Sequence, residues 1–274
     1  MRDRVREQLS SFAALFGVLL YLFPIYWMVI SGFKTQAEIF ADPPTFFPRS
    51  STFESLRYVI SHENIGRYLL NSIRIAAPVM IITVALSAIG AYAMNRLRSR
   101  LVDIGLLAVL ILQVFPEALL ATPVFIIFKS LDLLNTFTAV ILAASARAVA
   151  FGLIILRPMF AQMPIELEEA SAVDGCTRLQ TFLYVVLPLM RVPLFVVAAI
   201  TFTQAYGQFV YPLALLNRQD LQPGTVGIFG FIGAEIADWH RVMAFATIFV
   251  APVLLLFLLL QRQIVAGLTG GALK

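Results

Sequence analysis

The chain has 274 residues, of which 60% are hydrophobic and 13% are charged, and its formal net charge is +4. Because soluble domains carry about 25% charged residues, this composition excludes an ordinary soluble protein and indicates one that lies mostly in lipid. The single cysteine, Cys176, excludes an intrachain disulfide framework, and the two histidines, His62 and His240, predict no metal site. The basic residues lie beside apolar segments rather than on one face, which argues against a nucleic-acid partner.

Six segments are apolar and long enough to cross a bilayer, which takes roughly 20 residues of helix. The first follows three arginines, as a signal peptide would, but it ends in Ser31-Gly32-Phe33-Lys34 without a cleavage sequence, so we expect it to be retained. The sequence thus predicts an all-α membrane protein with an external loop at residues 33–71 and a core domain at residues 72–262. The predicted transmembrane helices cover residues 12–32, about 73–94, 104–128, 137–157, 192–216 and 243–261.

The positions of lysine and arginine predict the orientation in the membrane. With both termini inside, the cytoplasmic segments hold eleven of these residues, whereas the external segments other than the long first loop hold three. Short cytoplasmic loops are enriched in Lys and Arg. Residues 1–11, residues 263–274 and the polar stretch at residues 164–188 are therefore expected in the cytoplasm.

Local signals in the stretch 164–188 predict two short helices separated by a turn. Pro164 suits the first position of a helix, and the acids that follow it favour a helix N-terminus. Gly175 can adopt the left-handed conformation that ends a helix, and Thr177 with Gln180 has the spacing of a capping box. Leu187-Pro188 ends or kinks the second helix. Such a pair could act as a lever that receives force from a soluble partner, or it could rest on the lipid headgroups; its acids oppose the second role.

The same stretch resembles the EAA signature of ABC importer permeases. The matching residues are Glu169-Ala170-Ser171, Asp174-Gly175 and Leu187-Pro188, with Ser171 and Cys176 departing from the usual alanines. The resemblance implies a coupling helix that docks into a groove of a cytoplasmic ATPase. The residues to which it assigns this role are Glu168, Glu169, Ala170, Ser171, Asp174, Gly175, Leu187 and Pro188.

A wider resemblance covers the whole chain. Asn71-Ser72, Ala91-Tyr92-Ala93 and the C-terminal Gln261–Lys274 resemble the carbohydrate-importer permeases of the maltose and glycerol-phosphate type. This implies the type I importer fold in a bacterial or archaeal inner membrane, a cytoplasmic ATPase dimer that uses Mg-ATP, a second homologous permease and an extracytoplasmic sugar-binding protein. The chain itself has no phosphate-binding loop of the Walker type, so it is expected to be a non-catalytic subunit without a cofactor of its own.

Polar residues inside the predicted spans are candidates for the cargo pathway. Glu117 and Arg147 are charged at membrane depth, which is costly and marks functional sites; their estimated depths overlap, so we hypothesise that they pair. Hydrogen-bonding and aromatic side chains in the fifth predicted span suit sugar rings. These are Gln204, Tyr206, Gln208 and Tyr211, and Tyr206-Gly207-Gln208 replace a Trp-Asn-acid sequence that is frequent in the family.

Two readings of the cargo and one other transporter class stay open at this point. The cargo is a sugar or sugar derivative, or another small solute such as glycerol phosphate. A secondary transporter would also have intramembrane charges, but it would be expected to show inverted repeats. A membrane-embedded enzyme would need clustered catalytic side chains, whereas Glu117 is isolated in the sequence.

Overall fold

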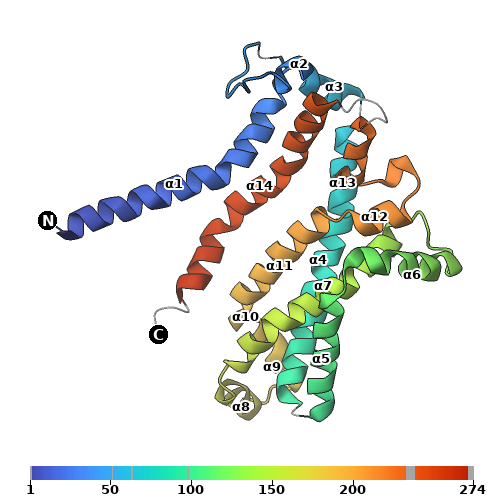
Figure 1. Ribbon diagram of the computed structural model, residues 1–274. Helices are drawn as coiled ribbons and strands as arrows, with labels where there is room; N and C mark the ends of the chain where they lie inside the picture. The colour runs from blue at the N-terminus through green and yellow to red at the C-terminus, as the bar shows by residue number, and fades with distance from the viewer. Residues whose placement is uncertain (1, 51, 63, 98, 233–237, 271–274) are drawn as a thin grey trace. The chain divides into compact units, whose positions relative to one another are not determined.

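The computed structural model describes residues 2–50, 52–62, 64–97, 99–232 and 238–270, and within these ranges it consists of helices and loops without a β-strand (Figure 1). The chain divides into two compact units, one formed by Met1–Gly66 with Gly227–Pro252 and the other by Arg67–Val226 with Val253–Lys274. The helices are α1 (Arg2–Ser31), α2 (Gln36–Ile39), α3 (Glu54–His62), α4 (Ile65–Arg96), α5 (Arg100–Val114), α6 (Glu117–Ser130), α7 (Phe137–Ala161), α8 (Glu166–Val173), α9 (Arg178–Thr181), α10 (Leu187–Leu189), α11 (Arg191–Tyr206), α12 (Val210–Leu215), α13 (Gly224–Gly227) and α14 (Trp239–Gly270), with a π-helical turn at Phe182–Val186 and 3-10 turns at Gln219–Leu221 and Ile228–Phe231.

Four helices among the described residues are long and apolar enough to cross a membrane by themselves. They are Ser10–Ser31 of α1, α4, α7 and Trp239–Leu258 of α14. The bent pair formed by Arg178–Leu189 and Arg191–Tyr206, whose axes differ by 75°, would make a fifth. The protein is therefore an α-helical membrane protein, and six spans with cytoplasmic termini stay a prediction.

Two of the predicted spans are each divided into two helices. The span at 104–128 is divided into α5 and α6, because Pro116 lacks an N–H and forces the preceding Phe115 into an extended conformation with φ −67° and ψ 128°. The span at 192–216 is divided into α11 and α12 by Gly207-Gln208-Phe209. Apolar character predicts that these segments lie in lipid, but it does not specify an unbroken helix.

The last predicted span, about 243–261, falls within α14, whose apolar part long enough to cross a membrane is Trp239–Leu258. The helix continues to Gly270, so the first part of the predicted tail at residues 263–274 is helical. Residues 271–274 of this tail lie outside the described residues, and a cytoplasmic tail stays a prediction.

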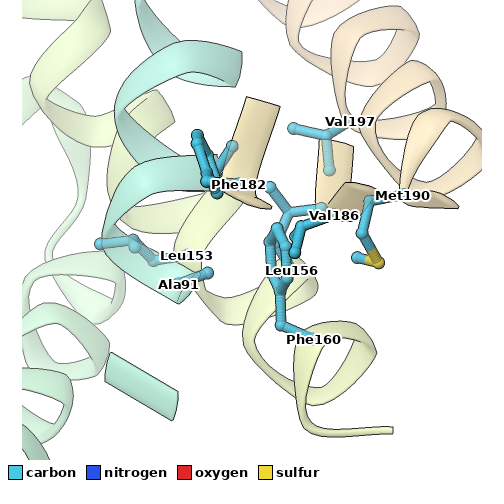
Figure 2. Close-up of a cluster of buried hydrophobic side chains, with 9 residues drawn as sticks. Ala91, Leu153, Leu156, Phe160, Phe182, Val186, Met190 and Val197 are labelled. Carbon is cyan, nitrogen blue, oxygen red and sulfur yellow. The ribbon is translucent and has the colours of Figure 1, made fainter. Parts of the chain in front are cut away.

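In the second unit, close packing joins the polar stretch to the membrane helices (Figure 2). Ring centroids of Tyr92 and Phe182 lie 5.0 Å apart, and those of Tyr92 and Phe160 lie 6.0 Å apart. In lipid, such packing stabilises a fold through dispersion rather than through removal of apolar surface from water. The buried cluster comes from α4, α7, the π-helical turn and α11, with Met190 between α10 and α11: Ala88, Ala91, Leu153, Leu156, Phe160, Phe182, Val186, Met190 and Val197.

A small-residue contact brings α7 close to α4. A Cβ atom added to Gly152 would lie 2.6 Å from Oγ of Ser87 and 2.7 Å from its Cβ, so only glycine fits at this position. Small residues allow helix backbones to approach where lipid supplies no hydrophobic driving force. The contact holds α7, which carries Arg147 of the candidate cargo cavity, against α4.

A compact cap forms within the first unit, where an ordered external loop was expected. Lys34 is 1% exposed; its Nζ donates a hydrogen bond to the carbonyl of Thr45 and lies 4.4 Å from the centroid of the Trp27 ring. The Glu38 carboxylate accepts hydrogen bonds from the N–H of Arg49 at 2.6 Å and the hydroxyl of Thr45 at 3.1 Å. These bonds satisfy Nζ of Lys34 and Oε1 of Glu38, which would otherwise be costly to bury, whereas Oε2 of Glu38 is buried without a hydrogen-bond partner.

Candidate functional site

The polar stretch 164–188 has the helix–turn–helix structure that its sequence predicts. Helix α8 begins at Glu166 and carries three acids in its first turn, where the helix dipole favours negative charge. Its C-terminus is a Schellman motif: the N–H of Cys176 donates to the carbonyl of Ser171 at 3.0 Å, and that of Gly175 to Ala172 at 3.1 Å. Gly175 has a φ of +85°, a conformation that glycine adopts without strain.

The second helix begins with the predicted capping box. Oγ1 of Thr177 accepts from the N–H of Gln180 at 3.3 Å, and Oε1 of Gln180 accepts from the N–H of Thr177 at 2.8 Å. The helix passes through a π-helical turn and ends at Leu189, one residue after Pro188. A bend of 75° then leads into α11.

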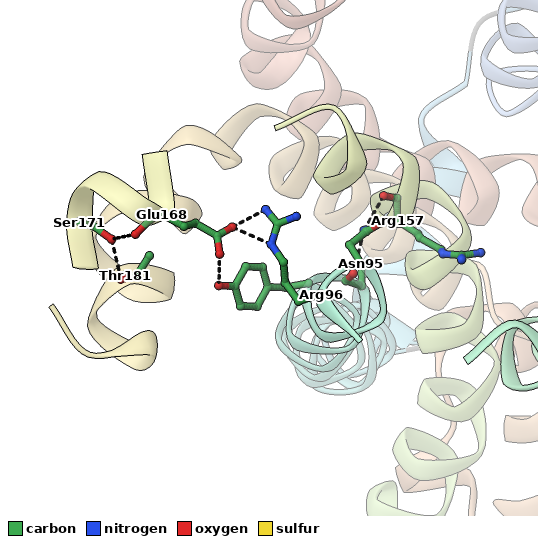
Figure 3. A network of polar contacts seen from close by, with 8 residues as sticks. Asn95, Arg96, Arg157, Glu168, Ser171 and Thr181 are labelled. Carbon is green, nitrogen blue, oxygen red and sulfur yellow. Dashed lines mark hydrogen bonds and ion pairs between the residues drawn. The ribbon is translucent and has the colours of Figure 1, made fainter. Parts of the chain in front are cut away.

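A polar network joins α8 to the end of α4 (Figure 3). Oε2 of Glu168 accepts a hydrogen bond from the Tyr92 hydroxyl at 2.8 Å, and Oε1 accepts one from Nε of Arg96 at 2.9 Å. Nη2 of Arg96 completes the ion pair with the same Oε1. The Glu168 side chain is only 15% exposed. Both Glu168 and Glu169 were assigned to coupling. Glu168 binds side chains of α4 in its own chain, whereas Glu169 is exposed.

Ser171, which departs from the signature, joins the two short helices. It is buried; its Oγ donates to the carbonyl of Glu168 at 2.8 Å and lies 2.7 Å from the hydroxyl of Thr181. The serine thus fills the position of a small residue and adds a polar link from α8 to α9. The other positions assigned to coupling are exposed or half-buried: Ala170, Asp174, Gly175 and Pro188 are exposed, and Leu187 is half-buried.

Four of the six predicted pathway residues line one cavity of about 360 Å³ in the second unit. They are Glu117, Arg147, Gln204 and Gln208. Tyr206 and Tyr211, which were predicted to face the same path, are 2% and 3% exposed and lie outside its lining. Tyr206 instead stacks with Phe202, with ring centroids 6.0 Å apart, and Tyr211 lines a neighbouring apolar cavity of about 320 Å³.

The hypothesis that Glu117 and Arg147 pair is wrong: among the described residues no ion pair joins them. Glu117 accepts a hydrogen bond from Nε2 of Gln208 at 2.7 Å. Arg147 donates from Nη1 to the carbonyl of Phe115 at 3.1 Å and from Nη2 to the carbonyl of Gln113 at 3.3 Å. It caps carbonyls freed at the end of α5, a role that its sequence depth alone could not reveal.

The profile of the family described as "binding-protein-dependent transport system inner membrane component" matches residues 83–270, which is more than half of the chain. The chain belongs to this family. It is a multi-pass permease subunit of the inner membrane rather than an enzyme, and permeases of this family work with a substrate-binding protein and a cytoplasmic ATPase.

Individual relatives match the permease over almost its full length. The sulfoquinovosyl glycerol transport system permease protein SmoH of Agrobacterium fabrum is 31% identical over 253 residues, covering 92% of this chain and 89% of that protein. The trehalose/maltose transport system permease protein MalG of Thermococcus litoralis is 32% identical over 279 residues, covering 100% and 99%. In fold, the permease is similar to a chain of a bacterial ABC transporter involved in import of the acidic polysaccharide alginate, with a TM-score of 0.79, 18% identity and coverage of 96% and 97%.

Sequence reasoning missed several residues that shape the permease's two sites. Gln113 lines the cavity, and its Nε2 donates to the carbonyl of Arg147 at 2.7 Å; its signal was an isolated amide in an apolar run. Arg96 binds Glu168, which lies 72 residues further along the chain, and no local sequence pattern indicates this partner. Asn71 was noted in the sequence for its resemblance to the carbohydrate permeases; it donates to the carbonyls of Asp220 and Gln222, at 2.8 and 3.1 Å, and so holds the loop after α12 against the first part of α4.

Proposed function

We propose that this permease forms half of an ATP-driven import pathway for a sugar or sugar derivative. The observation that carries the proposal is the cavity of about 360 Å³, which places Gln113, Glu117, Gln204 and Gln208 inside an apolar helical unit. Amides and a carboxylate offer both donors and acceptors, as the hydroxyl groups of a sugar require. The names of the relatives MalG and SmoH, which specify trehalose or maltose and sulfoquinovosyl glycerol, support a carbohydrate cargo.

We further propose that residues 164–188 dock on the partner ATPase. The exposed surface of this stretch combines the acid Glu169 with apolar side chains that are unusually open: Val173 is 89% exposed, Tyr184 73% and Leu179 66%. Apolar anchors surrounded by charge are typical of a protein interface. The partner ATPase then binds and hydrolyses Mg-ATP, and this chain binds no cofactor itself.

The remaining partners belong to the same proposal. A second, homologous but different permease supplies the other half of the pathway, and an extracytoplasmic sugar-binding protein delivers the cargo. Closure of the ATPase dimer moves the stretch 164–188 and turns the pathway from inward-facing to outward-facing. Lipid surrounds the spans, and no nucleic acid takes part.

An acidic small solute, such as glycerol phosphate, is the second candidate cargo. Arg147 favours it, because the guanidinium group lines the cavity and can bind an anion. Two carbonyls already accept hydrogen bonds from this side chain, so the neutral sugar remains the first candidate.

Uptake into proteoliposomes tests the proposal. The permease would be reconstituted with its partner permease, ATPase and binding protein, and uptake of labelled maltose, trehalose and glycerol 3-phosphate would be measured. We expect ATP-dependent uptake of a sugar that Gln204→Ala and Gln208→Ala reduce, while Gln219→Ala, on an exposed loop, leaves it unchanged. Uptake that persists when the ATPase's phosphate-loop lysine is replaced would contradict an ATP-driven importer.

A further inference from the structure

Two adjoining cavities lie where α4 ends and α5 begins. The first has a volume of about 500 Å³, and its walls include Arg96, Arg100 and Arg157. The second, of about 370 Å³, is lined mainly by apolar side chains of α5 and α7, among them Leu106, Leu110, Ile154 and Pro158. Both cavities are lined by Asn95, Arg157 and Ala161, so the basic compartment adjoins the apolar one.

We propose that these two cavities form one binding site for an anionic phospholipid of the cytoplasmic leaflet. The phosphate of the headgroup lies among the arginines, and an acyl chain lies in the apolar groove between α5 and α7. The site differs from the cargo cavity, with which it shares no lining residue.

The charge of the basic compartment favours a phosphate group. A guanidinium group presents a planar fork of N–H donors that matches phosphate oxygens, and three such groups are in the walls. Glu168 neutralises Arg96, but it does not line this compartment. The N-terminus of the 15-residue helix α5, which Ser99 caps, also lies there and adds the positive end of a helix dipole.

The position of the site favours a lipid over a free anion. Arg96 is the last residue of α4, Arg100 is the first residue of α5, and Arg157 lies near the end of α7. Because α4 and α7 are apolar helices long enough to span the membrane, these arginines lie where basic side chains meet headgroups. Basic pockets between membrane helices on the cytoplasmic side are suited to anionic headgroups. A free phosphate ion would use the arginines alone and would leave the apolar groove unoccupied.

Occupancy of this site has a consequence for the coupling stretch. Arg96 lines the basic compartment and also binds Glu168 of α8. A phosphate in the compartment would hold the guanidinium group in place from a second side. The lipid would thereby stabilise the orientation of α8 relative to α4.

Retention of lipid by the intact transporter tests the site. The complete complex would be placed in nanodiscs of phosphatidylcholine with or without phosphatidylglycerol, and lipids that remain bound after gentle detergent exchange would be counted by native mass spectrometry. We expect phosphatidylglycerol to be retained over phosphatidylcholine. Loss of one arginine near the membrane surface costs about 1 kcal/mol, so Arg100→Gln should weaken retention about fivefold.

Two further variants separate headgroup and acyl-chain contributions. Leu110→Trp, which fills the apolar groove, should also lower retention, whereas Arg191→Gln, which removes an exposed arginine that lines neither cavity, should not. Equal retention of the two lipids, or equal loss in all three variants, would overturn the proposal. Displacement of the bound lipid by inorganic phosphate alone, with Leu110→Trp without effect, would instead assign the basic compartment to free phosphate. Because lipid is counted directly, the result does not depend on which solute is transported.

Discussion

Gln208 donates a hydrogen bond of 2.7 Å to Oε1 of Glu117, and this bond joins two interruptions of membrane helices. Glu117 is the first residue of α6, directly after the break at Pro116, and Gln208 lies in the break between α11 and α12. The backbone of Gln208 also accepts a hydrogen bond from the hydroxyl of Thr225 at 2.6 Å. Irregular backbone at membrane depth is tolerated where it is buried in protein or lines a cavity, and both of these breaks contribute a polar residue to the lining of the proposed pathway.

A double-mutant cycle on Glu117 and Gln208 should give a measurable coupling energy. A hydrogen bond to a charged group contributes about 1.5–3 kcal/mol, and the polar surroundings of the cavity reduce this contribution. We therefore expect a coupling energy of about 1 kcal/mol between Glu117→Ala and Gln208→Ala, measured by thermal unfolding of the purified permease complex. The matched cycle of Glu117→Ala with Arg147→Ala should give less than about 0.5 kcal/mol. A larger coupling energy in the second cycle would show that Glu117 and Arg147 form an ion pair, contrary to the structure.

The sequence allowed local structure to be predicted better than side-chain partnerships. The caps at Thr177 and Gly175 depend on neighbouring residues, and the structure has both of them. The helix break at Pro116 is also predictable from neighbouring residues, because proline lacks an N–H and forces its predecessor into an extended conformation. Glu117 and Gln208 are 91 residues apart in the chain. Depth in the membrane, estimated from the sequence, could place Glu117 near Arg147. Which group each side chain contacts depends on the path of the backbone at the two helix breaks, and the sequence does not give this path.

Glu168 and Glu169 should have separable roles although they are neighbours. Glu168→Ala removes the hydrogen bonds from Tyr92 and Arg96 and leaves the half-buried Arg96 without its carboxylate, so we expect a loss of about 1–2 kcal/mol in unfolding free energy. Glu169→Ala should change stability by less than about 0.5 kcal/mol, because the side chain is exposed. Under the proposed docking, it should nevertheless weaken co-purification of the ATPase.

The measurement combines a thermal melt with a pull-down of the ATPase by the tagged permease complex. Tyr92→Phe is the companion variant, since it removes one donor to Glu168 and keeps the ring that packs on Phe182. It should show part of the destabilisation. If Glu169→Ala destabilised the complex as much as Glu168→Ala, the division of roles between the two acids would be refuted.

Gly175→Ala should destabilise the turn between α8 and α9 through the backbone alone. The residue has φ +85°, and an added Cβ would meet no atom within 4 Å, so the cost is conformational rather than steric. We expect about 1–2 kcal/mol from the left-handed conformation. Gly105→Ala is the matched control: it also has open space but lies inside α5, where alanine should stabilise by roughly 0.5–1 kcal/mol. Chemical denaturation of the detergent-solubilised complex would distinguish the opposite signs, and a neutral effect of Gly175→Ala would show that the Schellman turn is not retained.

The cap of the first unit should lose stability in acid through Glu38. The N–H of Arg49 donates to this carboxylate and is the main reason that the pKa of Glu38 lies below its ordinary value; Thr45 and Lys34 lower it further, while burial opposes them. Because the folded-state pKa is depressed, the stabilisation is complete above the unfolded value of about 4.3 and is lost as the pH falls through the folded-state pKa.

Melting temperature would be compared between wild type and Glu38→Gln from neutral to acidic pH. Glu54→Gln, which changes an exposed acid of the same unit, is the control. We expect the wild type to be the more stable at neutral pH and the difference to shrink below about pH 4; a difference that stays constant over this range would mean that the Glu38 carboxylate does not stabilise the cap as an anion.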